Sequence, residues 1–286
     1  MRVAHFSDVH ALDLDGVSPW QFVNKRAAGY LNLLWRRREK HSFDIFSALV
    51  VDLNRDPPDE VICTGDLTNL SLEPEFNLAR RAMDEIRLGP KHVTVVPGNH
   101  DVYTRSAKQE GLFGKLFADY FSGDAQGADA FPFVRTRGEV AIVGVSTARP
   151  SLPPFADGSI GKQQLAEVER LLAQTQGKFR IVALHHPPLD NRHSFLRGLR
   201  DRAALQAVLK RVGCEMVLHG HEHRDLRQQL DGPRGPIPII GVGSVTYRDS
   251  RPDRSARYNV YHIENGRLAQ LETRVYDSAS NLFSRL

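Results

Sequence analysis

Side chains suited to metal binding gather in five short segments between residues 8 and 223. The segments are Asp8-Val9-His10, Gly65-Asp66, Gly98-Asn99-His100-Asp101, His185-His186-Pro187 and His219-Gly220-His221-Glu222-His223. The last two hold five of the 12 histidines. One histidine after a strand is usually structural, and Asp-x-His alone is common by chance. Five histidines in two short segments are better explained by a metal site.

Each segment follows a short apolar run, which predicts that its side chains lie at the end of a buried strand. In an extended segment Asp8 and His10 point the same way, and ligands of open α/β sheets collect at the carboxyl ends of strands. Polar groups there are costly to bury unless something binds them. We expect eight strands, over residues 3–6, 60–64, 92–96, 140–145, 180–184, 216–218, 238–242 and 258–263.

Four stretches between these strands have the period of an amphipathic helix. Their apolar positions fall within residues 43–53, 76–86, 165–172 and 205–212, on one face of each helix. Pro74 and Gly213 stand where helices begin and end. The alternation of strands and helices predicts an α/β fold with a largely parallel core. Because candidate ligands occur both before residue 10 and after residue 220, we expect one domain over residues 1–286.

The five segments occur in the order Asp-x-His, Gly-Asp, Gly-Asn-His-Asp, His-x-Pro and Gly-His-x-His. This series resembles the calcineurin-like metallophosphoesterase superfamily, in its bacterial phosphodiesterase-type branch. It spans residues 8 to 223 and is far more specific than any one of its segments. The resemblance implies the metallo-dependent phosphatase fold, which is a four-layer α-β-β-α sandwich with two mixed β-sheets and a dinuclear metal centre.

The resemblance also implies which residues hold the metals. One metal would take Asp8, His10 and His223, the other Asn99, His185 and His221, with Asp66 bridging both. His185 is preferred to His186 because the family ligand stands two residues before the proline, so His186 and His219 become supporting residues behind the ligands. Mixed Asp, Asn and His ligands suit manganese, iron or zinc. Two divalent ions can clamp a phosphoryl group and supply a metal-bound hydroxide for in-line attack.

His100 binds no metal in the family scheme and faces the substrate. We therefore expect it to stabilise the transition state or to protonate the leaving oxygen, with Asp101 or Asn69 orienting its ring. The alternative is a supporting residue that only makes hydrogen bonds. The expected enzyme is a phosphodiesterase, with phosphomonoesters as a further substrate class. A metal-bound scaffold is the alternative outside enzymes.

Residues 17–40 form a candidate helical cap beside the site. They hold both tryptophans, Trp20 and Trp35, and end near the basic run Arg36-Arg37-Arg38. Such a stretch can cover a greasy substrate or, through residues 20–38, contact a membrane surface. A helix packed on the core with a solvated basic end explains the pattern equally well. A second basic segment, residues 248–257, contains interleaved aspartates and is interpreted as a surface loop, with an arginine that reaches a substrate phosphate as the alternative.

Departures from the family pattern bear on the substrate. Cyclic-nucleotide and glycerophosphodiester phosphodiesterases commonly place an acidic and then a basic residue after Gly-Asn-His-Asp, whereas Val102 and Tyr103 follow here. Hydrolases of UDP-diacylglucosamine often carry arginine at the position of His100. A cyclic nucleotide and a nucleotide-linked lipid pyrophosphate therefore stand as alternatives to a general phosphodiester. A repair nuclease would need a DNA-capping domain, for which the residues after 223 are too few.

The composition is that of an ordinary globular protein, with 41% hydrophobic and 25% charged residues. A formal net charge of +4 suits phosphate-ester small molecules or lipid-linked phosphates but is too small to favour nucleic acid. Cys63 and Cys214 lie in apolar runs without a disulfide framework, and we find no signal peptide or membrane span. We expect a cytoplasmic protein whose oligomeric state the sequence leaves open.

Overall fold

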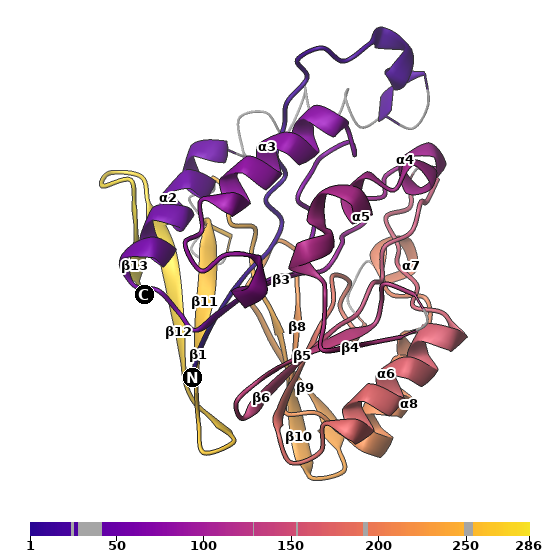
Figure 1. The fold of residues 1–286 in the computed structure, drawn as a ribbon, viewed down its shortest axis with the longest axis vertical. Helices are drawn as coiled ribbons and strands as arrows, with labels where there is room; N and C mark the ends of the chain where they lie inside the picture. Colours follow the sequence, from indigo (N-terminus) through magenta and orange to yellow (C-terminus); the bar gives the residue numbers. More distant parts are fainter. Residues whose placement is uncertain (24–25, 28–41, 128, 153, 191–193, 249–253) are drawn as a thin grey trace.

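Two mixed β-sheets form the centre of the molecule (Figure 1). The computed structural model describes residues 1–23, 26–27, 42–127, 129–152, 154–190, 194–248 and 254–286. The first sheet has the strand order β13 (Leu282–Arg285), β12 (Arg267–Asp277), β11 (Arg257–Glu264), β1 (Arg2–Phe6), β2 (Glu60–Cys63) and β3 (Val93–Val95). The second has the order β4 (Ala125–Gln126), β5 (Phe133–Arg137), β6 (Val140–Gly144), β7 (Phe179–Ala183), β8 (Met216–His219), β10 (Gly235–Gly241) and β9 (Leu226–Gly232).

Two pairs of longer helices cover the outer faces of the sheets. Helices α2 (Phe43–Arg55) and α3 (Glu73–Asp84) lie against the first sheet, and α6 (Lys162–Gln174) and α8 (Arg202–Val212) lie against the second (Figure 1). Shorter turns of helix connect the rest, namely η1 (Pro19–Phe22), η3 (Pro90–His92), α4 (Arg105–Glu110), α5 (Leu112–Phe117), η4 (Ala118–Tyr120) and α7 (Ser194–Arg197).

The apolar core divides into layers because alternate strand residues point to opposite faces. In β1, Ala4 and Phe6 pack under α2 and α3, whereas Val3 joins the cluster between the two sheets. In β6, Val143 packs under α6 and α8, whereas Ile142 joins that same central cluster. One apolar cluster thus lies between the sheets and one lies outside each. This layering confirms the predicted four-layer α-β-β-α sandwich.

The central strands of both sheets run parallel. Strands β1, β2 and β3 pair in parallel, and so do β6, β7, β8 and β10, while antiparallel strands complete the edges. All eight predicted strands and all four predicted helices are present, with ends that differ by a few residues. Parallel strands bring their carboxyl ends to one edge of each sheet, which is where the predicted ligands follow.

Much of the candidate cap lies outside the described residues, including Trp35 and the basic run 36–38. Its described part contains the turn η1, in which Trp20 is 82% exposed. Arg26 is buried and donates to the carbonyl oxygens of Leu70 and Ser71. The basic segment 248–257 is likewise described only in part. No helix among the described residues is long and apolar enough to cross a membrane.

Candidate metal centre

The predicted ligands follow strands of both sheets. Asp8 and His10 come after β1, Asp66 after β2 and Asn99 after β3, all in the first sheet. From the second sheet, His185 follows β7, and His221 and His223 follow β8. All seven are buried except His223, which is partly exposed. The chain therefore brings these side chains together only when both sheets are assembled.

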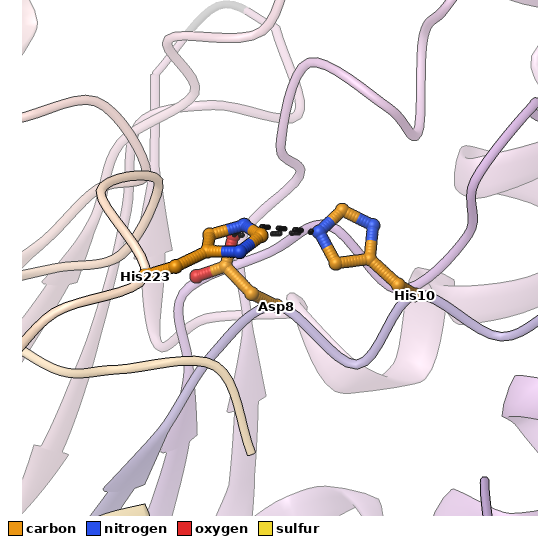
Figure 2. Close-up of side chains that lie close together, drawn as sticks. All are labelled: Asp8, His10 and His223. Carbon is orange, nitrogen blue, oxygen red and sulfur yellow. Dashed lines mark hydrogen bonds and ion pairs between the residues drawn. The ribbon is translucent and has the colours of Figure 1, made fainter. Parts of the chain in front are cut away.

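One group consists of Asp8, His10 and His223 (Figure 2). The Nε2 atom of His223 lies 3.1 Å from Asp8 Oδ1 and 3.1 Å from His10 Nε2. The Nε2 atom of His10 lies 3.8 Å from Asp8 Oδ1. Three potential ligand atoms thus converge on one point between β1 and β8.

The second group consists of Asn99, His185 and His221, with the carboxylate of Asp66 beside them. The Nε2 atom of His185 lies 3.2 Å from Asn99 Oδ1, 3.2 Å from His221 Nδ1 and 3.3 Å from Asp66 Oδ2. The same Asp66 Oδ2 lies 3.9 Å from His10 Nε2 in the first group. Asp66 therefore stands between the two groups, at the place expected of a bridging carboxylate.

The hydrogen bonds of the histidines leave their ligand atoms turned toward the centre. His185 Nδ1 lies 2.7 Å from the carbonyl oxygen of Thr64, and His10 Nδ1 lies 3.3 Å from that of Thr68. A carbonyl oxygen only accepts, so each Nδ1 carries the proton and each Nε2 presents a lone pair when the ring is neutral.

Electron-pair donors facing one another need a positive charge among them. Around His185 Nε2 these donors are the oxygens of Asn99 and Asp66. Asp8 Oδ1 is buried and has no hydrogen-bond partner among the residues that the structure describes, although His223 is within ion-pair distance. A proton or a metal ion would supply the missing charge, so this donor set fits divalent cations.

The pKa shifts of Asp66 and His185 also indicate that a positive charge is needed between their facing atoms. Burial raises the pKa of the Asp66 carboxyl, but the imidazoles of His185 and His100 outweigh burial and hold this pKa well below its usual range. Burial lowers the pKa of His185, but the Asp66 carboxylate outweighs it and raises this pKa to about 9. Without metal the pair is thus held together by a proton on His185, which a metal would have to displace.

The backbone at five of the predicted ligands is strained. Asp8, His10, Asp66, His221 and His223 have φ angles of 58°, 51°, 54°, 71° and 51°. This left-handed region costs a residue with a side chain roughly 1–2 kcal/mol. Only three other non-glycine residues share it among those that the structure describes. Strain of this kind concentrates at functional sites and persists because the surrounding fold imposes it.

Two glycines of the motifs allow close approach to the carboxylates. A Cβ atom on Gly98 would lie 2.1 Å from Asp66 Oδ1, and one on Gly220 would lie 1.9 Å from Ser7 Oγ and 2.6 Å from Asp8 Oδ2. Any side chain at either position would displace a predicted ligand. The lack of a side chain at Gly98 and Gly220 is therefore what lets the two carboxylates occupy their positions.

His100 lies at the rim of the centre. Its Nδ1 donates to the main-chain carbonyl of Asn69 at 2.5 Å, its ring stacks on Tyr103 with centroids 5.1 Å apart, and it meets the ring of His10 edge-on at 5.0 Å. Its ring also lies with His10 and Asp66 as a group whose ligand atoms are within 4.8 Å of one another. Geometry alone thus does not separate His100 from the ligands.

Of the two residues expected to orient His100, Asn69 contacts its ring through the main chain. The Asn69 side chain instead donates to the carbonyl oxygens of His10 and Ala11. The Asp101 carboxylate accepts hydrogen bonds from the main-chain N–H groups of Gly98 and Thr68. Asp101 therefore ties together the loops after β2 and β3.

His186 and His219 lie buried behind the ligands. His186 Nδ1 is 2.7 Å from Thr147 Oγ1, and its ring centroid is 4.5 Å from that of His221. His219 Nδ1 donates to the carbonyl of Gly220 at 3.0 Å. Burial lowers the pKa of both, that of His219 to about 4, so both rings are neutral at pH 7.

Sequence reasoning missed the groups that fix the histidine rings. The carbonyl oxygens of Thr64, Thr68 and Asn69 carry no signal in the sequence, because every residue has one. In the sequence, the stacking partner Tyr103 stands out only as a departure from a family pattern. Its place two residues after Asp101 is the one feature that could have pointed to it.

Comparisons with known proteins agree with this geometry. The family model described as calcineurin-like phosphoesterase matches residues 1–225. A probable cyclic nucleotide phosphodiesterase of Vesicomyosocius okutanii is 24% identical over 73% of this chain and 80% of its own length. A cAMP/cGMP dual specificity phosphodiesterase of Mycobacterium tuberculosis is 27% identical over 66% of this chain and 55% of its own. A dimetal phosphatase of Danio rerio has a similar fold, with a TM-score of 0.61, 16% identity and coverage of 96% and 95% of the two chains.

Proposed function

This chain belongs to the calcineurin-like phosphoesterase family and is a metal-dependent phosphoester hydrolase, and on that premise we propose that it cleaves phosphodiester bonds. The observation that carries the proposal is the pair of ligand groups joined at Asp66. One centre with two cation positions can hold two oxygens of the same phosphoryl group. Relatives named as phosphodiesterases favour the diester over the monoester.

The ligand assignment is part of the proposal. Asp8, His10 and His223 would hold one cation, Asn99, His185 and His221 the other, and Asp66 both. When bound, two divalent ions polarise the phosphoryl oxygens and lower the pKa of coordinated water. Oxygen and nitrogen ligands together suit manganese, iron or zinc. Since the ligands come from both sheets, we also propose that residues 1–286 act as one domain.

His100 is proposed to serve the reaction from the rim. Its Nδ1 proton is engaged by the Asn69 carbonyl, and the Tyr103 ring holds its plane. This leaves Nε2 as the atom that can hold a proton for the leaving oxygen or donate to a phosphoryl oxygen. In this proposal Asn69 orients His100 without touching the substrate. His186 and His219 likewise act from behind the ligands, through the contact with His221 and the hydrogen bond to Gly220.

The proposed substrates are small phosphodiesters. The relatives named for cyclic nucleotides make these the first natural compounds to assay. A nucleotide-linked lipid pyrophosphate and a phosphomonoester are the competing substrates. Contact of residues 20–38 with a membrane would favour the lipid-linked compound.

The first test compares bis(p-nitrophenyl) phosphate with p-nitrophenyl phosphate. Chelator-treated protein is resupplied with manganese, zinc or iron, and bound metal is counted. We expect activity to return with about two metals per chain and to be faster on the diester. Faster hydrolysis of the monoester would refute the diester assignment, and one metal per chain at full activity would refute the bridging role of Asp66.

Variants separate ligand from rim residue. Asp66→Ala is expected to lose metal and activity together, because both ligand groups contain its carboxylate. His100→Ala is expected to keep both metals and lose about 10²–10⁴-fold in turnover. His262→Ala is the matched control, because His262 pairs with Arg2 at the far end of β1 from Asp8. Loss of a metal in His100→Ala would make His100 a ligand.

A further inference from the structure

A cavity of about 580 Å³ lies beside the candidate metal centre. Its walls come from the start of α4, the loop after β6 and the segment before α8, and they include Tyr103, Arg105, Arg149, Phe155, Asp157 and Arg200. We call this the arginine cavity. Its volume falls within the range of small-molecule sites, and none of these residues belongs to the ligand set above.

The arginine cavity shares walls with the metal centre at two points. Tyr103 lines the cavity, and its ring stacks on His100 with centroids 5.1 Å apart. Asp157 lines it as well, and a Cβ atom on the next residue, Gly158, would lie 2.4 Å from His186 Nδ1. The His186 ring in turn contacts the predicted ligand His221. The contact of Tyr103 with His100 therefore places one wall of the cavity next to the rim of the centre.

Two arginines of the cavity are fixed by one buried carboxylate. Asp157 is 1% exposed, and its Oδ2 accepts from Arg149 Nη1 at 2.9 Å and from Arg200 Nε. Each guanidinium has five N–H groups. Within the described residues, the bond to Asp157 is the one side-chain hydrogen bond that Arg149 and Arg200 each donate. Asp157 thus holds both side chains in place while most of their donors stay available, which reduces the entropy lost on binding a ligand.

The cavity has an excess of positive charge. Arg105 is exposed at its wall and makes no ion pair within the described part of the chain. The lining residues thus include one carboxylate, that of Asp157, and three guanidinium groups, those of Arg105, Arg149 and Arg200. Forked guanidinium donors match the oxygens of a phosphate group, and the aromatic rings of Tyr103 and Phe155 offer apolar surface beside them.

We propose that the arginine cavity binds a second phosphate group, carried by the organic part of the substrate. This inference rests on the proposed function, because it assumes that the scissile phosphate sits at the metals. It names the preferred class as phosphodiesters with a further phosphate, such as esters of a nucleoside bisphosphate. A cyclic mononucleotide has only the phosphate that the metals would hold, and so it leaves the arginines unused.

A matched pair of substrates tests this assignment in the metal-loaded enzyme. One is the p-nitrophenyl ester of thymidine 5′-phosphate, and the other is the same ester with a phosphate on the 3′-oxygen. Both release p-nitrophenolate from the same bond. We expect kcat/KM to be about 10- to 100-fold higher for the second, as charge-assisted hydrogen bonds predict. Equal values for the two esters would overturn the proposal.

Charge-matched variants locate the preference. The double variant Arg105→Gln/Arg149→Gln is expected to lower the ratio of the two kcat/KM values to near unity. Arg170→Gln/Arg211→Gln removes the same charge from exposed positions on α6 and α8, where the two residues pair with Glu167 and Glu169, and is expected to keep the ratio. A ratio that falls equally in both variants would indicate a general charge effect and refute the cavity as the site.

A binding measurement keeps the outcome separate from failure of the proposed function. If neither ester is hydrolysed by enzyme with two metals, the diesterase proposal fails. Thymidine 3′,5′-bisphosphate is then titrated into chelator-treated protein by calorimetry. Weaker binding by Arg105→Gln/Arg149→Gln than by the control variant supports the cavity, and equal binding by the two variants refutes it.

Discussion

Replacing Gly98 with alanine is the sharpest test of how the site is built, because it removes no ligand and adds one methyl group. The added Cβ would lie 2.1 Å from Asp66 Oδ1 and 2.4 Å from the main-chain nitrogen of Asp66. An unstrained contact between carbon and oxygen needs roughly 3.3 Å. The carboxylate must therefore retreat by roughly 1.2 Å on this contact distance, and the main chain must move as well.

The displacement reaches both ligand groups and His100. Asp66 Oδ2 stands between His10 and His185, and Asp66 Oδ1 accepts the main-chain N–H of His100 at 2.8 Å. A misplacement of about 1 Å costs on the order of 10²-fold in rate. Overpacking adds a loss of about 1–3 kcal/mol in the free energy of unfolding. We expect Gly98→Ala to bind fewer than two metals and to lose at least about 100-fold in kcat/KM.

The control is Gly114→Ala in α5. Apart from the adjacent residues and the backbone of its own helix, no heavy atom of the described residues lies within 4 Å of a Cβ on Gly114. Alanine in a helix is more stable than glycine by about 0.5–1 kcal/mol. Both variants are assayed for metal content by mass spectrometry, for hydrolysis of bis(p-nitrophenyl) phosphate and for thermal unfolding. If Gly98→Ala keeps two metals and the rate of Gly114→Ala, the close approach of Gly98 to Asp66 is not what forms the centre.

Three further predictions concern buried groups that are not proposed as ligands. Burial raises the pKa of Glu75 from 4.5 to about 8 although the main-chain N–H groups of Leu70 and Leu72 donate to its carboxyl group. The contribution of Glu75 to stability is therefore greatest below pH 4.5 and is lost as pH rises through 8. In urea unfolding, Glu75→Gln should remove up to roughly 1.4 kcal/mol per pH unit from the pH dependence of the free energy of unfolding in that range. Burial lowers the pKa of His5 from 6.5 to about 3. The contribution of His5 to the free energy of unfolding is therefore present above pH 6.5 and lost as pH falls toward 3. If stability depends on pH between 3 and 6.5 in the same way in His5→Gln and the wild type, this prediction is wrong. Burial raises the pKa of the Cys63 and Cys214 thiols, that of Cys214 to about 12, and both should react with a thiol reagent only after denaturation; rapid labelling of the native protein would show the prediction to be wrong.

The apolar runs predicted the buried strands well and the exposed ones poorly. Strands β9, β12 and β13 lie at or next to a sheet edge and are mostly exposed or half-buried, so they lack the continuous apolar run used as the signal. Strand β5 was missed because it contains Arg135, a charged residue that is 1% exposed. Its guanidinium donates to the carbonyl oxygens of Ser122, Pro90 and Val93, and only the folded chain supplies those partners.

The convergence of the proposed ligands was predictable because these residues are few, chemically distinctive and placed at strand ends. Their surroundings were not predictable for two physical reasons. Main-chain carbonyls orient the rings of His10, His185 and His100, and they have no signature in a sequence. The arginine cavity joins Arg105, Arg149 and Arg200 from separate loops, so only the tertiary structure shows that they face one space.

Because the proposed ligands come from two sheets, metal ions held by them would cross-link the fold. Strands β1, β2 and β3 supply Asp8, Asp66 and Asn99, whereas β7 and β8 supply His185 and His223. At a free ion concentration 100 times the dissociation constant, one bound ion would stabilise the native state by about 2.7 kcal/mol through mass action. The amount of folded protein in a cell would then follow the supply of metal, since chain that lacks metal would open more often and be degraded sooner.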